Sequence, residues 1–347
     1  PARRGSLGQP LMVTRRIRQT DSHALPVRGG AYTDIRELIR LRHGSKELDI
    51  SNANKARNPL SGLLASNFRG RGIDFAEVRT YQPGDDVRTI DWRVTARTGE
   101  AHTKLFQEEK ERPVLILVDQ SQSMFFGSRL AFKSVIAAEV GALLAWTALD
   151  RGDRVGGVVF SEQGHREVRP RRSKHSVLRL LHEINDFNQR LSQQAPAASN
   201  QNYLVEALRN LRRVVKHGCA VFIVSDFTTL ADNGNEEARL HLTQLARHND
   251  LVGIHISDPL ERHLPRPDLY SITNGTDRAR INTASQKFRQ AYQQHFEQQV
   301  TDLRHEFSRH KSPLFELSTA EPVLTSLVQQ YNDYARAATL PGRNPRG

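Results

Sequence analysis

The sequence predicts an α/β protein built on a doubly wound, mostly parallel β-sheet. Short, continuous apolar runs recur through the middle of the chain, as is typical of buried parallel strands. Segments with helical spacing of apolar residues separate these runs, and this alternation is the one that parallel strands with crossover helices require. The predicted buried strands are Pro113–Val118, Arg154–Phe160, Cys219–Ser225 and Asp250–Ile256.

The helices follow from apolar residues that recur every three or four positions. We expect them at Lys133–Ala148, Val177–Phe187, Leu204–Val215, Glu236–Arg247, Ala284–Arg309 and Pro322–Tyr334. Pro313–Leu317 is expected to add one more strand. Residues 259–283 are interpreted as an insertion that carries a hairpin with an Asn274–Gly275 turn. The basic segment Arg169–Lys174 is interpreted as an exposed loop.

The composition divides the chain into four parts. Residues 1–30 are rich in Arg, Gly and Pro and are predicted to be a disordered basic tail, within which Met12 is a possible natural start. Residues 31–111 are predicted to form a small, β-rich N-terminal subdomain that begins with a short helix after Tyr32 and includes an edge strand at His102–Glu108. Residues 112–336 hold the large sheet, and residues 337–347 form a second disordered tail.

The net charge of +12 lies mostly in the two tails. Residues 1–30 contain six arginines against the single acid Asp21, and residues 337–347 contain Arg343 and Arg346 without an acid. Nucleic-acid-binding proteins more often concentrate positive charge in their folded body, so solvated tails are the favoured interpretation. A nucleic-acid-associated protein that uses its Arg-rich tails stays open as an alternative.

Three features favour the cytoplasm. The longest apolar stretch, Val135–Leu149, contains Glu139 and is too short to cross a bilayer. The start of the sequence shows no apolar run of the kind that a secretory leader has. The chain contains one cysteine, Cys219, which excludes an intrachain disulfide.

Polar oxygen ligands follow two of the predicted buried strands. Asp119 ends the first strand and Asp226 follows the third, so both aspartates are expected at the same edge of a parallel sheet. Ser121 and Ser123 come at alternate positions after Asp119, and alternate residues of an extended loop point the same way. Carboxylate and hydroxyl oxygens suit Mg²⁺, with Mn²⁺ or Ca²⁺ as substitutes. An ordinary strand end with turn-forming serines is the alternative interpretation.

The pattern Asp-x-Ser-x-Ser at Asp119–Ser123 resembles the metal-ion-dependent adhesion site of von Willebrand factor A domains. This resemblance implies a Rossmann-like fold of that type and a cation that accepts an acidic side chain from a partner. It also implies that Ser121 and Ser123 bind the cation directly and that Asp226 takes the place of a later aspartate. Asn202 stands where that family has a threonine, and an amide oxygen is a weaker ligand.

A longer signature resembles domain-of-unknown-function family 58 of bacteria. It includes Arg69–Tyr81, Pro83–Arg93 and Gly152–Val155, and the resemblance covers residues 32–336. Members of this family are typically encoded beside AAA+ ATPases of the MoxR type. The resemblance therefore implies a non-enzymatic interaction module that acts with such an ATPase, and with a client protein, in chaperone-like assembly or in metal insertion.

The Arg/Asp-rich part of this signature has two interpretations. Its arginines are expected to pair with neighbouring aspartates and to pin the small subdomain onto the large sheet. A docking surface for a partner is the alternative. The arginines are Arg79, Arg88, Arg93 and Arg97, and the aspartates are Asp85, Asp86 and Asp91.

Enzyme classes find little support in the sequence. A metal-dependent phosphohydrolase with Asp119 as its nucleophile is disfavoured because Ser121 stands where such enzymes usually have a second aspartate. The sequence contains no Gly-Lys pair for a P-loop and no Gly-x-Ser-x-Gly elbow. His305 and His310 are five residues apart, so they diverge on a helix and do not form a zinc-binding pair. We therefore expect the protein not to be an enzyme.

Overall fold

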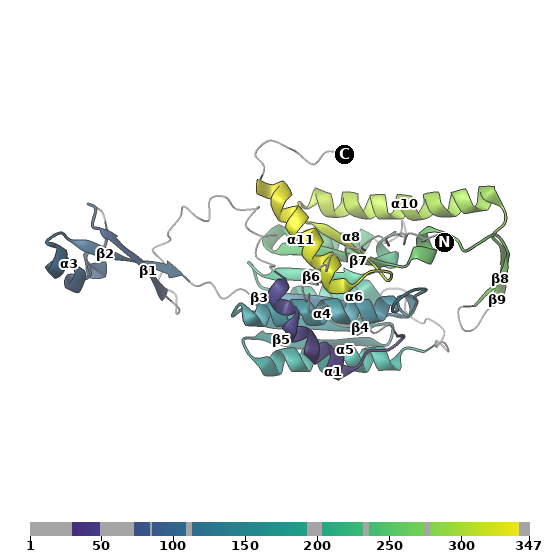
Figure 1. Cartoon of the computed structure of the whole chain (residues 1–347), viewed down its shortest axis with the longest axis horizontal. Helices are drawn as coiled ribbons and strands as arrows, with labels where there is room; N and C mark the ends of the chain where they lie inside the picture. The colour runs from purple at the N-terminus through teal and green to yellow at the C-terminus, as the bar shows by residue number, and fades with distance from the viewer. Residues whose placement is uncertain are drawn as a thin grey trace, which may run out of the picture.

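A central sheet of six strands, in the order β10-β7-β6-β3-β4-β5, organises the chain in the computed structural model (Figure 1). β3, β4, β6, β7 and β10 run parallel, whereas β5 pairs antiparallel with β4 at one edge. The strands are β3 (Pro113–Asp119), β4 (Arg154–Ser161), β5 (Gly164–Arg171), β6 (Ala220–Ser225), β7 (Asp250–Ser257) and β10 (Leu314–Ser318). The structure describes residues 30–48, 73–83, 85–108, 113–192, 203–231, 236–273 and 278–339. The predicted mixed α/β fold with a mostly parallel sheet is confirmed.

Helices cover both faces of this sheet because the central strands are apolar on both sides. Val114, Ile116 and Val118 of β3 pack into one core with α4, α5 and α11, while Leu115 and Leu117 pack into the other with α6, α8 and α10. Alternate residues of a strand point to opposite faces, so one apolar run supplies both cores. The helices are α4 (Lys133–Asp150), α5 (Lys174–Arg190), α6 (Tyr203–Val214), α8 (Glu236–His248), α10 (Gln286–Arg309) and α11 (Val323–Thr339).

A short N-terminal helix, α1 (Ile35–Arg40), packs on the large sheet domain through α4 and α5. The indole N–H of Trp146 donates to the carbonyl oxygen of Leu38 at 3.1 Å, and Leu38 is 2% exposed. The turns η1 (Leu41–His43) and η2 (Ser45–Glu47) continue this contact along α4. Residues 30–48 therefore pack with the large domain, although the sequence grouped them with the Arg/Asp-rich segment.

The Arg/Asp-rich segment forms a small unit of its own, drawn at the left of Figure 1. It contains the antiparallel pair β1 (Ile73–Thr80) and β2 (His102–Glu108), the turn η3 (Val87–Thr89) and the helix α3 (Trp92–Thr98). Arg79 pairs with Asp85 at 2.7 Å, as expected. Asp86 and Asp91 accept backbone N–H groups at the starts of η3 and α3, because carboxylates satisfy the unpaired amides of a first helical turn.

Three further features differ from the sequence-based expectations or lie partly beyond the described residues. β5 is a strand that the sequence did not predict, and it takes Arg169 and Arg171 out of the expected loop. The hairpin β8 (Leu269–Thr273) and β9 (Arg278–Asn282) forms as expected, but its Asn274–Gly275 turn lies outside the described residues. α11 continues to Thr339, into the segment predicted as a tail, and residues 1–29 and 340–347 are not described.

Short helices complete the edge of the sheet on which the candidate site lies. α7 (Thr228–Ala231) follows β6, α9 (Pro259–Arg262) follows β7, and the turn η4 (Gln122–Met124) follows β3. In the described part of the chain, no helix has the length and apolar character needed to span a bilayer.

Candidate functional site

The two predicted aspartates lie next to each other at the carboxyl edge of the sheet. β3 and β6 are parallel neighbours in register, with Val118 opposite Val224, so the chain positions that follow these residues meet. The hydroxyl of Ser225 donates to Oδ2 of Asp119 at 2.5 Å, and Asp226 follows Ser225. The sequence-based placement of Asp119 and Asp226 at one edge is therefore confirmed.

Asp119 is a buried carboxylate held from two directions. Its Oδ1 accepts the backbone N–H of Ser121 at 2.9 Å, its Oδ2 accepts the hydroxyl of Ser225, and the residue is 2% exposed. Burial, and then the negative charge of Asp226, raise the pKa of Asp119 to about 7. A nearby cation would reverse this effect, because an opposite charge favours the ionised form.

The two serines point toward each other in the turn after β3. The hydroxyl oxygens of Ser121 and Ser123 are 3.1 Å apart, and Ser123 also bonds to Asp226. The turn between them is fixed from outside, because the backbone N–H of Gln122 donates to Glu162 at 2.8 Å. Ser121 and Ser123 thus bridge the two aspartates, and their hydroxyl oxygens are held in place.

Below this turn, amide side chains fix the end of β3. Gln120 is fully buried, and its Nε2 donates to the carbonyl oxygen of Ser134 at 2.9 Å. Asn188 of α5 donates to Oε1 of Gln120 at 3.0 Å and accepts the backbone N–H of Thr33. The Asp119 loop is therefore anchored to α4, α5 and the N-terminal segment.

Lys133 and Glu261 belong to the site, although no pattern in the sequence predicts them there. The ammonium of Lys133 lies 2.8 Å from Oδ2 of Asp226 and 2.6 Å from Oε1 of Glu261. Burial raises the pKa of Asp226, but the charge of Lys133 together with the hydrogen bonds from Lys133, Thr228 and Ser123 lowers the pKa below its usual value. The pKa of Lys133 is in turn raised by the two carboxylates, against the effect of its own burial.

The backbone after β6 aims Asp226 at this lysine. Phe227 adopts a left-handed conformation with φ of 53°, which is uncommon for a residue that is not glycine. Its N–H donates to the hydroxyl of Ser225 at 3.0 Å, while the N–H and hydroxyl of Thr228 both donate to Oδ1 of Asp226. Strained residues of this kind persist where the surrounding contacts hold them, and they concentrate at functional sites.

Asn202, the remaining predicted ligand, lies outside the described residues. Its neighbour Tyr203 begins α6 and accepts a hydrogen bond from the hydroxyl of Thr229 at 3.3 Å. Burial, and then the charge of Asp119, raise the pKa of Tyr203. The start of α6 therefore lies within electrostatic range of Asp119.

The donor set at this edge fits a hard divalent cation. Asp119, Asp226 and Glu261 are three carboxylates against the single ammonium of Lys133, which leaves a net charge of −2 when all are ionised. Hydroxyl oxygens from Ser121 and Ser123 supply neutral ligands, as Mg²⁺ and Ca²⁺ accept. Among the residues that the structure describes, no three His, Cys, Asp or Glu side chains form a metal-binding group, so a cation here would depend on the serines.

Comparison with known proteins assigns the chain to a family. The family model described as "Protein of unknown function DUF58" matches residues 77–302. The chain belongs to the DUF58 family. The match includes the whole Asp119 loop, Lys133 and Asp226, and it confirms the family that the Arg/Asp-rich signature predicted.

The relatives compared with this DUF58 protein are described as uncharacterized proteins. It is 28% identical over 229 residues to Rv1480 of Mycobacterium tuberculosis and to Mb1516 of Mycobacterium bovis, which covers 65% of the chain and 68% of each relative. A 51-residue stretch is 37% identical to YeaD of Bacillus subtilis, covering 15% of the chain and 13% of that protein. A crystal structure of the conserved hypothetical protein BatB from Bacteroides thetaiotaomicron matches with a TM-score of 0.37 and 17% identity, over 65% of this chain and 99% of BatB.

Proposed function

We propose that this DUF58 protein is a non-enzymatic interaction module of von Willebrand factor A type. In this proposal a divalent cation, Mg²⁺ by preference, is held by Asp119, Ser121 and Ser123, with Asp226 and Asn202 in supporting positions. The cation then accepts a carboxylate from a partner protein. The single observation that carries the proposal is the buried carboxylate of Asp119, whose pKa is raised to about 7 beside two hydroxyl groups.

The charge balance supports a cation in preference to an empty structural turn. Isolated buried carboxylates are costly, and proteins usually pair them or use them to coordinate metals. Lys133 already pairs with Asp226, and in the part of the chain that the structure describes the carboxylate of Asp119 contacts Ser121 and Ser225 but no ammonium or guanidinium group. A cation bound between Asp119 and the serines would compensate that charge.

The residues around Asp119 favour binding over phosphoryl transfer. Enzymes that use an aspartate nucleophile after a buried strand usually place a second aspartate two residues later, where this chain has Ser121. The neighbouring carboxylate, Asp226, is held by Lys133 and Thr228 and is therefore poorly suited to act as an acid. These contacts support the interpretation that the protein is not an enzyme.

The proposed partner is the MoxR-type AAA+ ATPase that the family resemblance implies, together with a client protein. The test is binding of the full chain to the purified ATPase from the same organism, measured by interferometry in Mg²⁺ and in chelator. The site variant is Ser121→Ala/Ser123→Ala. The matched control is Ser271→Ala, an exposed serine in β8.

We expect binding in Mg²⁺ that is lost in chelator and in the site variant, but kept in the control. Equal binding in chelator would contradict the cation-dependent mechanism. Absence of binding to the ATPase under all conditions, with the protein folded, would contradict the partner assignment.

A further inference from the structure

The small unit formed by β1, β2, η3 and α3 carries an exposed tryptophan. Trp92, the first residue of α3, is 70% exposed, more than any other large apolar side chain in the part of the chain that the structure describes. Val87, in the turn just before α3, is 62% exposed. An indole has a large apolar surface, and tryptophan is enriched among the residues that dominate binding between proteins. A tryptophan this exposed indicates a surface that a partner covers.

The local structure of α3 does not require the tryptophan. Asp91 caps the start of the helix, and Gly99 ends it in a left-handed conformation with φ of 78°. The hydroxyl of Thr95 accepts the backbone N–H of His102 in β2 at 3.0 Å, which joins the inner side of the helix to the strand. The helix is therefore held by its caps and by its inner side, while Trp92 lies in solvent.

The exposed side of α3 carries two arginines beside the tryptophan. An α-helix turns about 100° per residue, so the positions one, four and five after Trp92 fall within about 140° of it. These positions are Arg93, Ala96 and Arg97, and all three are exposed. We call these four residues the α3 face.

The two arginines of the α3 face are unpaired. Among the residues that the structure describes, neither the guanidinium of Arg93 nor that of Arg97 has an ion pair or a hydrogen bond. Arg79 of β1, by contrast, pairs with Asp85. The neighbouring Asp91 uses its Oδ1 to accept backbone N–H groups of the first helical turn. The two positive charges are therefore available to carboxylates from outside the chain.

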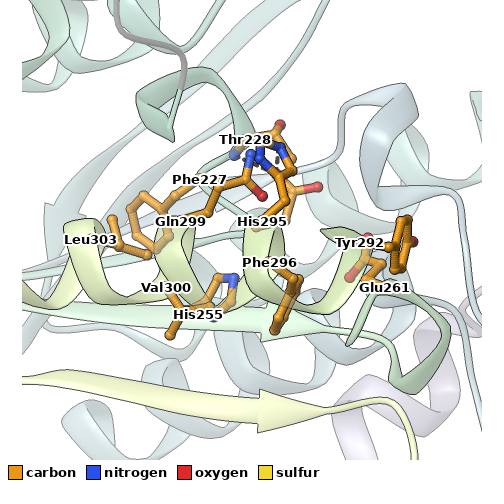
Figure 2. Close-up of a pocket in the computed structure, with 11 residues that line it drawn as sticks. Phe227, Thr228, His255, Glu261, Tyr292, His295, Phe296, Gln299, Val300 and Leu303 are labelled. Carbon is orange, nitrogen blue, oxygen red and sulfur yellow. Dashed lines mark hydrogen bonds between the residues drawn. The ribbon is translucent and has the colours of Figure 1, made fainter. Parts of the chain in front are cut away.

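The cavity beside α10 shows the opposite situation (Figure 2). Glu261 in its wall is paired with Lys133, and the guanidinium of Arg262 lies 5.4 Å from the centre of the Phe296 ring. The charged and aromatic groups of that wall thus meet partners within the chain. Trp92 has no such contact with a ring or a cation in the described segments.

The charge of the small unit selects the kind of partner. Residues 73–108 contain five arginines and lysines against seven aspartates and glutamates. The unit as a whole therefore does not attract a polyanion such as a nucleic acid, which basic proteins bind through a broad positive surface. Its unpaired positive charge is confined to the α3 face. Arginine there suits individual carboxylates, because its planar group donates two parallel hydrogen bonds to them.

We propose that the α3 face binds an acidic segment of a partner protein. Carboxylates of the segment contact Arg93 and Arg97, and an apolar side chain of the segment packs on Trp92. The α3 face and the Asp119 site are different surfaces, so this proposal does not depend on a cation at Asp119.

The test uses the full chain in chelator, so that no cation at Asp119 can attract a carboxylate. The probe is the peptide acetyl-Glu-Glu-Leu-Glu-Glu-Leu-amide, and the neutral control has Gln in place of each Glu. Oligothymidylate of the same net charge is the polyanion control. Affinity is measured by calorimetry. Quenching of tryptophan fluorescence by acrylamide locates the peptide, because Trp92 is exposed whereas Trp146, the second tryptophan of the chain, is fully buried.

Two variants change the α3 face. Trp92→Ala removes the indole, and Arg93→Gln/Arg97→Gln removes both charges. The matched control is Arg36→Gln/Arg40→Gln, since these two arginines are exposed and have the same spacing on the helix α1.

We expect saturable binding of the acidic peptide, protection of Trp92 from acrylamide, and binding of the neutral peptide that is at least about tenfold weaker. Each variant of the α3 face is expected to weaken binding by about tenfold or more. The Arg36→Gln/Arg40→Gln control should bind within about twofold of the wild type. Trp92→Ala should unfold at the wild-type temperature, because the side chain that it removes is exposed.

Several outcomes would overturn the proposal. No binding of the acidic peptide, equal affinity for the neutral peptide, or tighter binding of oligothymidylate would each do so. Unchanged binding by either variant of the α3 face would also contradict it. An equal loss of binding in the Arg36→Gln/Arg40→Gln control would mean that net charge alone attracts the peptide. A lower unfolding temperature of Trp92→Ala would mean that the indole packs within the protein.

Discussion

The ammonium of Lys133 lies 2.8 Å from the carboxylate of Asp226, and the two side chains are 1% and 3% exposed. Lys133 occupies the first position of α4, a helix that is buried around almost its whole circumference. This pair supplies the positive charge that Asp226 needs, and it leaves the neighbouring Asp119 as the group that a further cation would compensate.

Replacing Lys133 by Met is expected to destabilise the protein strongly. The substitution leaves Asp226 buried without its counter-charge, which typically costs about 3–5 kcal/mol. The measurement is denaturant-induced unfolding, followed by the fluorescence of the fully buried Trp146. Lys174→Met, an exposed control at the start of α5, should change stability by less than about 0.5 kcal/mol.

The double variant Lys133→Met/Asp226→Asn should recover much of this loss, because it removes both charges of the pair. A single Lys133→Met variant as stable as the wild type would show that the ion pair has little part in the fold.

The raised pKa of Glu139 predicts that the protein loses stability as the pH rises. Burial, and then the charge of Glu37 on α1, raise the pKa of Glu139 from 4.5 to about 7. The folded protein then binds more protons than the unfolded chain between these values, so this group lowers the free energy of unfolding as pH rises through that range. Below pH 4 the effect is absent, and above pH 8 it is complete.

The variant Glu139→Gln removes this titration. It is expected to be more stable than the wild type by about 2–3 kcal/mol at pH 8 and to show no such gain at pH 4. Unfolding curves of both proteins across this range are the measurement. Parallel pH profiles of the two proteins would contradict the assignment.

Leu38 tests whether residues 30–48 belong to the large domain. Leu38→Ala removes a buried side chain beneath Trp146, and we expect a loss of about 2–4 kcal/mol. The control Arg36→Ala, at an exposed position of the same helix, should cost little. If Leu38→Ala unfolds at the wild-type denaturant concentration, the segment does not support the sheet domain.

Gly157 in β4 lies too close to β3 for any side chain. A Cβ atom at this position would approach the carbonyl oxygen of Ile116 to 2.2 Å. We expect Gly157→Ala to lower the free energy of unfolding by at least about 1–3 kcal/mol. The reason is that the backbone of β3 or β4, and not a flexible side chain, would have to move. A stable Gly157→Ala protein, measured by thermal unfolding, would contradict this packing.

The sequence predicts the central strands well because they are buried on both faces and are therefore continuously apolar. β5 has no such signal. It is an antiparallel edge strand in which Val168 is buried while Arg166, Arg169 and Arg171 are exposed, so its sequence pattern is typical of a basic loop. Its pairing with β4 is a tertiary effect that composition does not report.

The sequence likewise predicts only part of the candidate site. It predicts Asp119 and Asp226, because each follows an apolar run and the strand ends of a parallel sheet meet. It does not predict Lys133 and Glu261, because Lys133 contacts Asp226 and Glu261 across 93 and 128 positions of the chain. The remaining signal is weak: Lys133 is a single basic residue at the start of an otherwise largely apolar helix.

Calorimetric titration with Mg²⁺ and Mn²⁺ tests the central claim most directly. The proteins compared are the wild type, Asp119→Ala and Ser121→Ala/Ser123→Ala, each first shown to be folded. The account predicts saturable binding to the wild type, none to Asp119→Ala and much weaker binding to the serine variant. It also predicts that binding below pH 7 releases a proton, since Asp119 must ionise to hold the cation. No binding of either ion to the wild type, or equal binding to Asp119→Ala, would contradict it.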